Sequence, residues 1–593
     1  MFMKQKSLLI VCITTLLCLM TSLFIESDLS YGISSPKTDG MVDVGIIYGK
    51  NNQFPIGVGS DQGFVFSSSD NGVLLDLSAY KSLVLYKDGF YEPSGRTLMT
   101  TGEYYLNGQV KGGYHIQIGS VYEMYDQVML EFARVQTVAP EAYLAYDNGW
   151  RIYTGHYMSQ EEAYASLNTM TVEMSSYVLI VTDPNPSSII VAANDKVLFS
   201  FDSTEKEFIF STQIFEVNAI KYRGYFIVKR LPGSDFTFIN RVSLNEYLYG
   251  VLPKEMSGDW PIEALKAQAI AARNYVLMSG DKYAAYGFNV DNTTSGQVYG
   301  GFSAEKPNSN RAVDETNGYV LTASGEIVPL FFHSHSGGIT DNSENVWNAP
   351  LTYIKSTLDL YSIGYPNTDW SVTMHRAEIE QKLIANGYSI GSLLSINIVE
   401  RAASGRVTKL ELIGSLSQAT LSKEKIRSVL GSTTLKSLLF SFDVGTAVTN
   451  ASSASVSSSA VKPTITPSIS PVSSNQSVAP LVMTSNAGIF GEFIESNKLS
   501  IFESGQTTTK SVDKAALERA SDIYTNPVQA TVPYMYNSTE SFDMSSGSVI
   551  FYGHGYGHGL GMSQFGAKKM AEMGMSFEEI LSFYYKDTQL LKQ

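Results

Sequence analysis

Cysteine is almost absent from this chain, because only Cys12 and Cys18 are found among its 593 residues. Both lie inside an apolar N-terminal run. The rest of the chain therefore has no disulfide, no thiolate nucleophile and no cysteine ligand for a metal ion.

Positive charge is also scarce. The chain carries 42 lysines and arginines against 57 aspartates and glutamates, which gives a formal net charge of -15. Proteins that bind nucleic acids present a basic stripe to the phosphates, and this sequence has no run of basic residues longer than a pair. We therefore expect no nucleic-acid partner.

The N-terminus has the layout of an export signal. Lys4 and Lys6 precede an apolar run over residues 8–25, and a polar stretch follows. No good small-x-small cleavage site follows the run, and about 18 apolar residues are near the lower limit for crossing a bilayer. Residues 1–30 are predicted to be a signal peptide or a signal anchor, and a retained anchor would use residues 7–25.

The length predicts about three or four folded units. The fold class is predicted to be α+β, with a mixed, β-rich catalytic core that contains an alanine-rich helix, preceded by a small β-α-β-β-α module. The predicted segments after the leader are a β-rich region (31–110), the module (111–178), the core (186–445), a Ser/Pro-rich disordered loop (446–485), an insertion (486–545) and a C-terminal completion of the core (546–593).

The module is predicted from its periodicity. Strand-like alternation over residues 114–121 is followed by helical spacing over 126–138, two further strands at 141–146 and 150–157, and a helix over 159–170. A Ser159 cap with Glu162 three residues later marks the start of that last helix.

The strings YHIQIGSV and GWRIYTGHYMSQEEAYASL in this stretch resemble the SPOR domain, whose members bind glycan strands that lack stem peptides. The alternative is another small α/β sandwich. The resemblance implies that Tyr114, Trp150 and Tyr153 stack on sugars, although alternating aromatics in strands also build cores.

Glu255 is the carboxylate with the most suggestive surroundings. It precedes a helix that is expected to start near Trp260 and to carry an alanine-rich buried face. A carboxylic acid that donates a proton at neutral pH needs apolar neighbours, and Leu252, Met256 and Trp260 are expected to provide them. Glu263 is the competing carboxylate, but its position in the first helical turn already explains it as a partner of the helix dipole.

The string LPKEMSGDWPIEALKAQAIAARNY resembles the signature of the stage II sporulation protein D family. That resemblance places the family's catalytic acid on Glu255, its glutamine on Gln268 and its arginine on Arg273. Ser257 stands where many members have proline, which leaves the turn less rigid.

Two later blocks resemble the same family. FFHSHSGGITDNSENVW contains Ser336 and Gly337, and GHGYGHGLGMSQFGAKKMAEMGMSFEEILSFYY contains His558, Ser563 and Gln564. Glycine-rich turns let backbone and short polar side chains approach an extended sugar chain. These five residues, with Gln268 and Arg273, are the predicted substrate-binding set.

The resemblance implies a peptidoglycan lytic transglycosylase that cleaves the β-1,4 bond between N-acetylmuramic acid and N-acetylglucosamine, forms a 1,6-anhydro product, and acts in sporulation or wall remodelling. A single carboxyl group suffices, although Asp259, Asp341 or Glu344 could supply a second one for a hydrolase. One alternative is a non-enzymatic amidase enhancer that binds glycan and stimulates a cell-wall amidase, and another is a passive wall-binding scaffold. Each implies an exported protein in the cell wall or on the outer face of the membrane.

Four histidines in two short motifs, at positions 333, 335, 554 and 558, raise a zinc hypothesis. Glycines interrupt the helical spacing that a metal motif would need. We therefore predict no metal and no cofactor.

Overall fold

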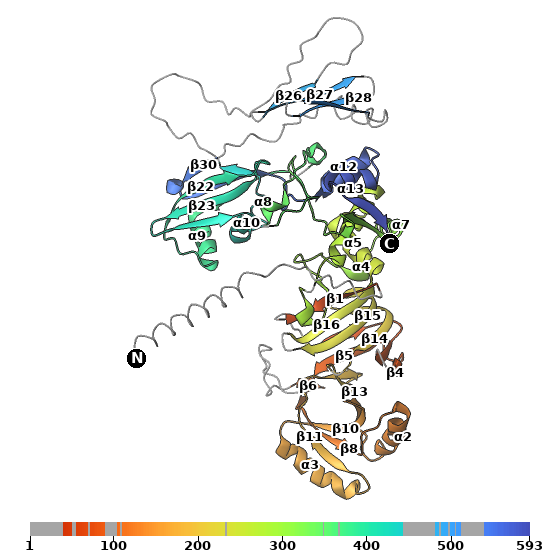
Figure 1. Cartoon of the computed structure of the whole chain (residues 1–593). Coiled ribbons are helices and arrows are strands. Elements are labelled where there is room, and N and C mark those ends of the chain that lie inside the picture. Colours follow the sequence, from red (N-terminus) through yellow and green to blue (C-terminus); the bar gives the residue numbers. More distant parts are fainter. Residues whose placement is uncertain are drawn as a thin grey trace, which may run out of the picture. The chain divides into compact units, whose positions relative to one another are not determined.

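The computed structural model describes most of the chain (Figure 1). The described residues are 40–49, 55–68, 72–88, 104–106, 109–204, 206–231, 234–280, 282–347, 349–365, 368–442, 481–485, 488–495, 498–503, 506–511 and 539–593. They form two compact units. Unit 1 comprises Met1–Asp259, Ala269–Pro329 and Leu591–Gln593, and unit 2 comprises Trp260–Gln268 and Leu330–Leu590.

Unit 1 is built on a large mixed sheet. Its strands outside the predicted module are β1 (Met41–Ile47), β2 (Ile56–Gly59), β3 (Phe64–Ser68), β4 (Gly72–Leu77), β5 (Ser82–Lys87), β12 (Ser188–Ala193), β13 (Lys196–Asp202), β14 (Phe208–Val217), β15 (Ile220–Leu231), β16 (Ser234–Ser243) and β17 (Val290–Asp291). A separate pair is formed by β6 (Tyr104–Leu106) and β7 (Gln109–Lys111).

Aromatic side chains fill the interior of this sheet, which explains why these segments adopt strands. Phe210 and Phe226 stack with centroids 4.6 Å apart, and Phe66 stacks on Phe208 at 5.2 Å. The β12–β13 hairpin closes through Asn194 and Asp195, both at positive φ, as a two-residue hairpin turn requires.

The segment predicted as a module has the predicted order β8 (Tyr114–Ile118), α2 (Tyr125–Val135), β9 (Tyr143–Tyr146), β10 (Trp150–Tyr157) and α3 (Gln160–Glu173). A further strand that was not predicted, β11 (Leu179–Thr182), follows it. Its strands lie in the order β11-β8-β10-β9, which is a ferredoxin-like arrangement. The sheet continues because β9 pairs in parallel with β13. The predicted cap is confirmed, since the Ser159 side chain accepts from the Glu162 N–H at 3.2 Å.

The rest of unit 1 contains α4 (Leu244–Glu255), most of α5 (Ile262–Leu277), a 3-10 turn (Ala284–Tyr286), α6 (Gly301–Ala304), α7 (Pro307–Glu315), β18 (Tyr319–Ala323) and β19 (Glu326–Ile327). Ser243 and Glu246 form a capping box at the start of α4. The predicted alanine-rich helix is confirmed as α5, and its alanines at 264, 267, 269, 271 and 272 are buried.

Unit 2 contains β20 (Phe332–His333), α8 (Ser343–Val346), a 3-10 turn (Leu360–Ser362), β21 (Asp369–His375), α9 (Arg376–Ala385), β22 (Leu393–Arg401), β23 (Val407–Gly414), β24 (Gln418–Ser422), α10 (Lys425–Leu430) and β25 (Phe440–Phe442). The C-terminal part supplies β30 (Glu540–Asp543), a 3-10 turn (Met544–Ser546), β31 (Ser548–His554), β32 (Met562–Ser563), α12 (Gln564–Glu572) and α13 (Phe577–Tyr584). The last strand, β33 (Gln589–Lys592), ends in unit 1 and belongs to the sheet of β18 and β19. A four-stranded sheet is formed by β26 (Leu481–Ser485), β27 (Gly488–Glu495), β28 (Lys498–Glu503) and β29 (Gln506–Ser511).

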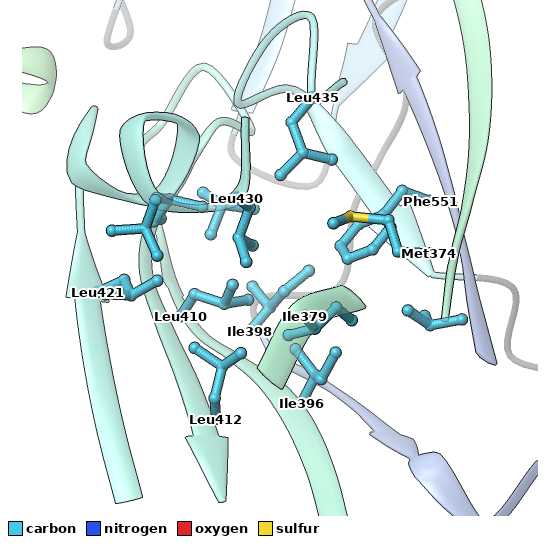
Figure 2. Close-up of a cluster of buried hydrophobic side chains, with 14 of the residues drawn as sticks. Met374, Ile379, Ile396, Ile398, Leu410, Leu412, Leu421, Leu430, Leu435 and Phe551 are labelled. Carbon is cyan, nitrogen blue, oxygen red and sulfur yellow. The ribbon is translucent and has the colours of Figure 1, made fainter. Parts of the chain in front are cut away.

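One hydrophobic core joins these distant segments. Figure 2 shows Met374, Ile396, Leu410 and Phe551 pointing toward a shared interior, where each is fully buried. β31 lies between β21 and β25, and β30 pairs with β22. The C-terminal segment therefore completes two sheets that begin more than a hundred residues earlier.

The strand-rich architecture with separate helices agrees with the predicted α+β class. The predicted leader at 1–30 and residues 446–480 of the predicted loop lie outside the described residues. Among the residues that the structure does describe, no helix combines the length and the apolar character needed to span a bilayer. The predicted segment boundaries stay predictions.

Candidate functional site

Glu255 is the last residue of α4, in unit 1. Its neighbours Leu252 and Met256 are buried, and Glu255 itself is half-buried. Burial raises the pKa of Tyr247 and of Tyr275, and the negative charge of Glu255 contributes to both shifts. Leu252 and Met256 therefore provide part of the predicted apolar flank, and two phenols lie within electrostatic range. Trp260, the third predicted neighbour, packs on Phe565 in unit 2.

Glu263 has a structural position in unit 2. One carboxylate oxygen accepts from the Lys266 ammonium at 2.9 Å, and the other accepts from the Phe577 backbone N–H at 2.9 Å. Phe577 is the first residue of α13, so its backbone N–H has no acceptor within the helix, and Glu263 provides one. These contacts agree with its predicted structural role.

Arg273 anchors α5 within unit 1. The side chain is only 2% exposed, and its guanidinium donates to the carbonyl oxygens of Tyr319 at 3.1 Å and Val313 at 3.5 Å. Burial lowers its pKa to about 10. The neighbouring Asn274, which the motif did not single out, exchanges hydrogen bonds with the backbone of Leu321 at 2.7 and 3.0 Å. Both side chains hold the helix to β18, and a substrate contact by Arg273 stays a prediction.

Gln268 is fully buried in the middle of α5. Neither its amide oxygen nor its amide nitrogen has a hydrogen-bond partner among the described residues. An unpaired buried amide costs about 1–3 kcal/mol. Of the predicted binding residues, Gln268 therefore has the side chain whose polar atoms are least explained by the fold.

The two glycine-rich blocks, separated by about 200 residues in sequence, pair with each other in unit 2. His335 and Tyr556 exchange backbone hydrogen bonds at 3.0 and 2.9 Å, and β20 runs parallel to β32. Gly337 has a φ of +72°, and a Cβ there would lie 2.9 Å from the Gly555 nitrogen. Only glycine fits this close approach. The two segments are far apart in sequence, so their motifs did not predict that they would meet.

Ser336 and Ser563 lie near the buried carboxylate of Asp359, a residue that the sequence did not single out. Burial raises the pKa of Asp359 to about 6, whereas the hydroxyl groups of Ser336, Ser362, Ser563 and Tyr584 lower it. Ser336 and Ser563 are both fully buried. The hydrogen bonds of the Ser336 hydroxyl are with Ser362 and Gly338, and those of the Ser563 hydroxyl are with Ser334 and Gly566. The predicted contact of both serines with a substrate has no open surface in the structure.

Gln564 begins α12 and is also buried, at 8% exposure. Ser563 caps this helix by accepting from the Gly566 N–H at 3.2 Å. The block that resembles a ligand loop is therefore also a helix start.

The histidines of the two blocks are held neutral. Burial lowers the pKa of His335 and of His558 to about 4, and it also holds the pKa of His333 well below its usual value. The His333 Nδ1 lies 3.0 Å from the Leu560 carbonyl oxygen, and the His558 Nδ1 accepts from the Leu560 N–H at 3.0 Å. Within the described part of the chain, these rings do not form a group of three metal-ligating side chains.

A half-buried aromatic group lies beside α12. Trp260 contacts Phe565 edge-on at 4.9 Å, and Tyr365 contacts the same ring at 5.0 Å. The Lys568 ammonium lies 5.3 Å from the Trp260 ring centre and 5.0 Å from that of Tyr365. The tryptophan of the motif therefore packs within unit 2, where a cation covers it.

Two of the three predicted sugar-stacking residues are core residues. Trp150 is 1% exposed and packs on Tyr125 and Tyr146, so the expectation that it offers an open platform is corrected. Tyr153 is buried and stacks on His115 at 5.6 Å. Tyr114 is half-buried, and its predicted contact with a sugar stays a prediction.

Comparisons with known proteins bear on two regions. Residues 233–322, which include Glu255, Gln268 and Arg273, match the family model described as stage II sporulation protein. Residues 345–455 match a family model described as a domain of unknown function.

Three relatives match longer parts of the chain. The amidase enhancer of Bacillus subtilis (strain 168) is 29% identical over 58% of this chain and 40% of its own length. An uncharacterized protein of Brachyspira hyodysenteriae is 32% identical over 34% of this chain and 55% of its own. Stage II sporulation protein D of Bacillus subtilis is 32% identical over 24% of this chain and 47% of its own. The chain thus spans about half the length of these relatives, and the matches support the predicted resemblance to the stage II sporulation protein D family.

Proposed function

We propose that this protein acts in the bacterial cell wall as a peptidoglycan lytic transglycosylase with Glu255 as its acid and base. The observation that carries the proposal is the position of Glu255. It is half-buried between buried apolar neighbours, at the C-terminal end of α4. A half-buried carboxyl group among apolar side chains is the kind of group that can act as a proton donor.

In the proposed reaction, the Glu255 carboxylic acid protonates the glycosidic oxygen as the bond between N-acetylmuramic acid and N-acetylglucosamine breaks. The resulting carboxylate then takes the proton of the muramyl 6-hydroxyl, whose oxygen bonds to the anomeric carbon. The product is a 1,6-anhydro sugar, and Glu255 is protonated again. No water is consumed, so a second carboxylate is not needed.

The competing carboxylate is already engaged elsewhere, which supports this assignment. Glu263 binds Lys266 and the first amide of α13. The site that the family model covers, residues 233–322, contains Glu255. The protein is proposed to be exported to the cell wall or the outer face of the membrane, to act in sporulation or wall remodelling, and to bind peptide-free strands through residues 111–178.

A second function is favoured by one comparison. The relative that matches 58% of this chain is named amidase enhancer. In that case the protein would bind glycan and stimulate a partner amidase without cleaving sugar bonds. Glu255 would then be dispensable for the stimulating effect.

Product analysis separates the two functions. The purified full chain is incubated with peptide-free glycan strands and with intact peptidoglycan, and the products are identified by mass spectrometry. Glu255→Gln removes the proton donor and keeps the shape, whereas Glu326→Gln, at an exposed glutamate of unit 1, is the matched control. Anhydro-ended products from the native chain and the control, lost in Glu255→Gln, are expected.

Other outcomes contradict the proposal. Reducing-end products would indicate hydrolysis instead of transglycosylation. If no glycan product forms and both variants stimulate an added cell-wall amidase as well as the native chain does, the enhancer function replaces it.

A further inference from the structure

Three side chains that can bind a metal ion meet in unit 1, far in sequence from the motif that contains Glu255. They are Asp88, which follows β5, His115 on β8 and His156 on β10. One ligand atom from each lies within 4.8 Å of the others. Asp88 and His115 are buried, and His156 is half-buried.

The hydrogen bonds of His115 leave a place for a cation. Its Nδ1 lies 2.8 Å from the Gly155 carbonyl oxygen, which can only accept, and 3.0 Å from the Tyr143 hydroxyl oxygen, which can accept or donate. Its Nε2 lies 3.0 and 3.1 Å from the two carboxylate oxygens of Asp88. When Nδ1 donates to Gly155, the Nε2 lone pair of a neutral ring points at the Asp88 carboxylate, and a metal ion or a second ring proton fits between them.

The surroundings match those of a histidine that binds a metal. Such a histidine normally donates its other ring N–H to a carbonyl or carboxylate, which fixes its orientation, and His115 does this with Gly155. The His156 ring is also held, because it lies parallel to the Tyr143 ring at 5.2 Å and edge-on to His115 at 5.0 Å. Two imidazoles and one carboxylate form a ligand set that zinc and similar ions accept.

A cavity reaches this group and provides room for a fourth ligand. It has a volume of about 220 Å³, and its walls include Asp88, His115, Tyr153 and Arg151. A site with three protein ligands keeps an open position for water, whereas a closed structural site uses four. The cavity could hold that water.

We propose that Asp88, His115 and His156 bind one divalent transition-metal ion, with its open coordination position facing the cavity. The ion would bridge β8 and β10 to the chain that follows β5, and would replace the proton between His115 and Asp88. This site lies outside residues 233–322, so it does not depend on the proposed cleavage of glycan.

Metal titration of the full chain tests the site. The purified protein is stripped with a chelator, and zinc binding is measured by calorimetry, with cobalt absorption as a second readout. Asp88→Asn and His156→Phe each remove one ligand and keep the side-chain shape. His375→Phe is the matched control, because His375 is exposed and lies outside the group.

One ion per chain is expected for the native protein and for His375→Phe. Each ligand variant should lose at least about tenfold in affinity, since even the outer contacts of metal ligands are worth about 10–100-fold. Circular dichroism and a thermal melt verify that the variants fold. Equal zinc affinity in both ligand variants and the native chain would place the ion elsewhere and overturn the proposal. Absence of zinc binding, with both His115 nitrogens protonated in ¹⁵N NMR spectra, would show that a proton occupies the place.

Discussion

Asp359→Asn should stabilise unit 2 at neutral pH. The side chain is fully buried, and burial raises the pKa of its carboxyl group from 3.8 to about 6. One pH unit corresponds to about 1.36 kcal/mol, so keeping this carboxylate ionised in the folded state costs about 3 kcal/mol above pH 6. Asparagine keeps the shape without the charge, and its amide can donate as well as accept hydrogen bonds. The variant should gain up to about 3 kcal/mol.

The gain should depend on pH in a defined direction. Because the folded pKa of Asp359 is above the unfolded value, the folded state binds a proton more tightly between pH 3.8 and about 6. This contribution to stability is fully present below pH 3.8 and is lost as the pH rises through about 6. The difference in unfolding free energy between Asp359→Asn and the native chain should therefore be small near pH 3.8 and reach its full size above pH 6.

The buried histidines act in the opposite direction. The pKa values of His335 and His558 are lowered from 6.5 to about 4, so the stability they contribute is present above pH 6.5 and is lost as the pH falls through about 4. They affect the variant and the native chain alike. The difference in free energy between the two proteins therefore isolates Asp359, although neither pH profile does so alone.

Calorimetric unfolding of the full chain between pH 4 and pH 7.5 measures this difference. Asp587→Asn is the control, because Asp587 is exposed and its φ of +53° is one that asparagine tolerates. The control should change stability by less than about 0.5 kcal/mol. A variant at Asp359 that is less stable than the native chain at pH 7.5, or a gain that does not change with pH, would refute the reasoning.

Three further predictions follow from the packing. Gly566→Ala should destabilise unit 2 by about 1–3 kcal/mol in a urea titration, because the new Cβ would lie 2.0 Å from the Tyr584 hydroxyl oxygen. Gly57→Ala is the control and should be nearly neutral in the same titration, because no atom lies within 4 Å of its Cβ. Asn274→Ala should cost about 3 kcal/mol or more in urea unfolding, since it leaves buried backbone groups without partners, and a loss under 1 kcal/mol would contradict this. The ring of His558 should show no titration above about pH 5 in NMR spectra, because its pKa is lowered to about 4; a midpoint near 6.5 would show that the ring is open to solvent.

The local patterns were predicted well from the sequence. Periodicity placed the strands and helices between residues 114 and 173, and the Ser159 cap is observed as expected. The alanine face of α5 is buried along its length. Such features depend on residues within a few turns of one another, which is the range that sequence patterns cover.

The contacts that decide the roles of the motif residues are distant in sequence. Ser336 and Ser563 have the composition of a ligand loop, but Asp359, the buried carboxylate beside them, lies outside the blocks that contain them. Trp150 shows the same limit, because an aromatic residue in a strand has one pattern whether it faces solvent or the core. Burial could not be read from the spacing.

The glycines of the C-terminal block have a packing role. A Cβ on Gly557 would lie 2.7 Å from the His333 Cβ, and one on Gly559 would lie 2.6 Å from the Arg406 guanidinium carbon. Both glycines also have positive φ values. Substituting them would therefore disturb the fold first, and a loss of activity in such variants would not identify a ligand contact. The carboxylate of Glu255 differs, because it is half-buried at a helix end and can be changed to an amide of the same shape. It is therefore the position at which an activity assay tests chemistry instead of folding.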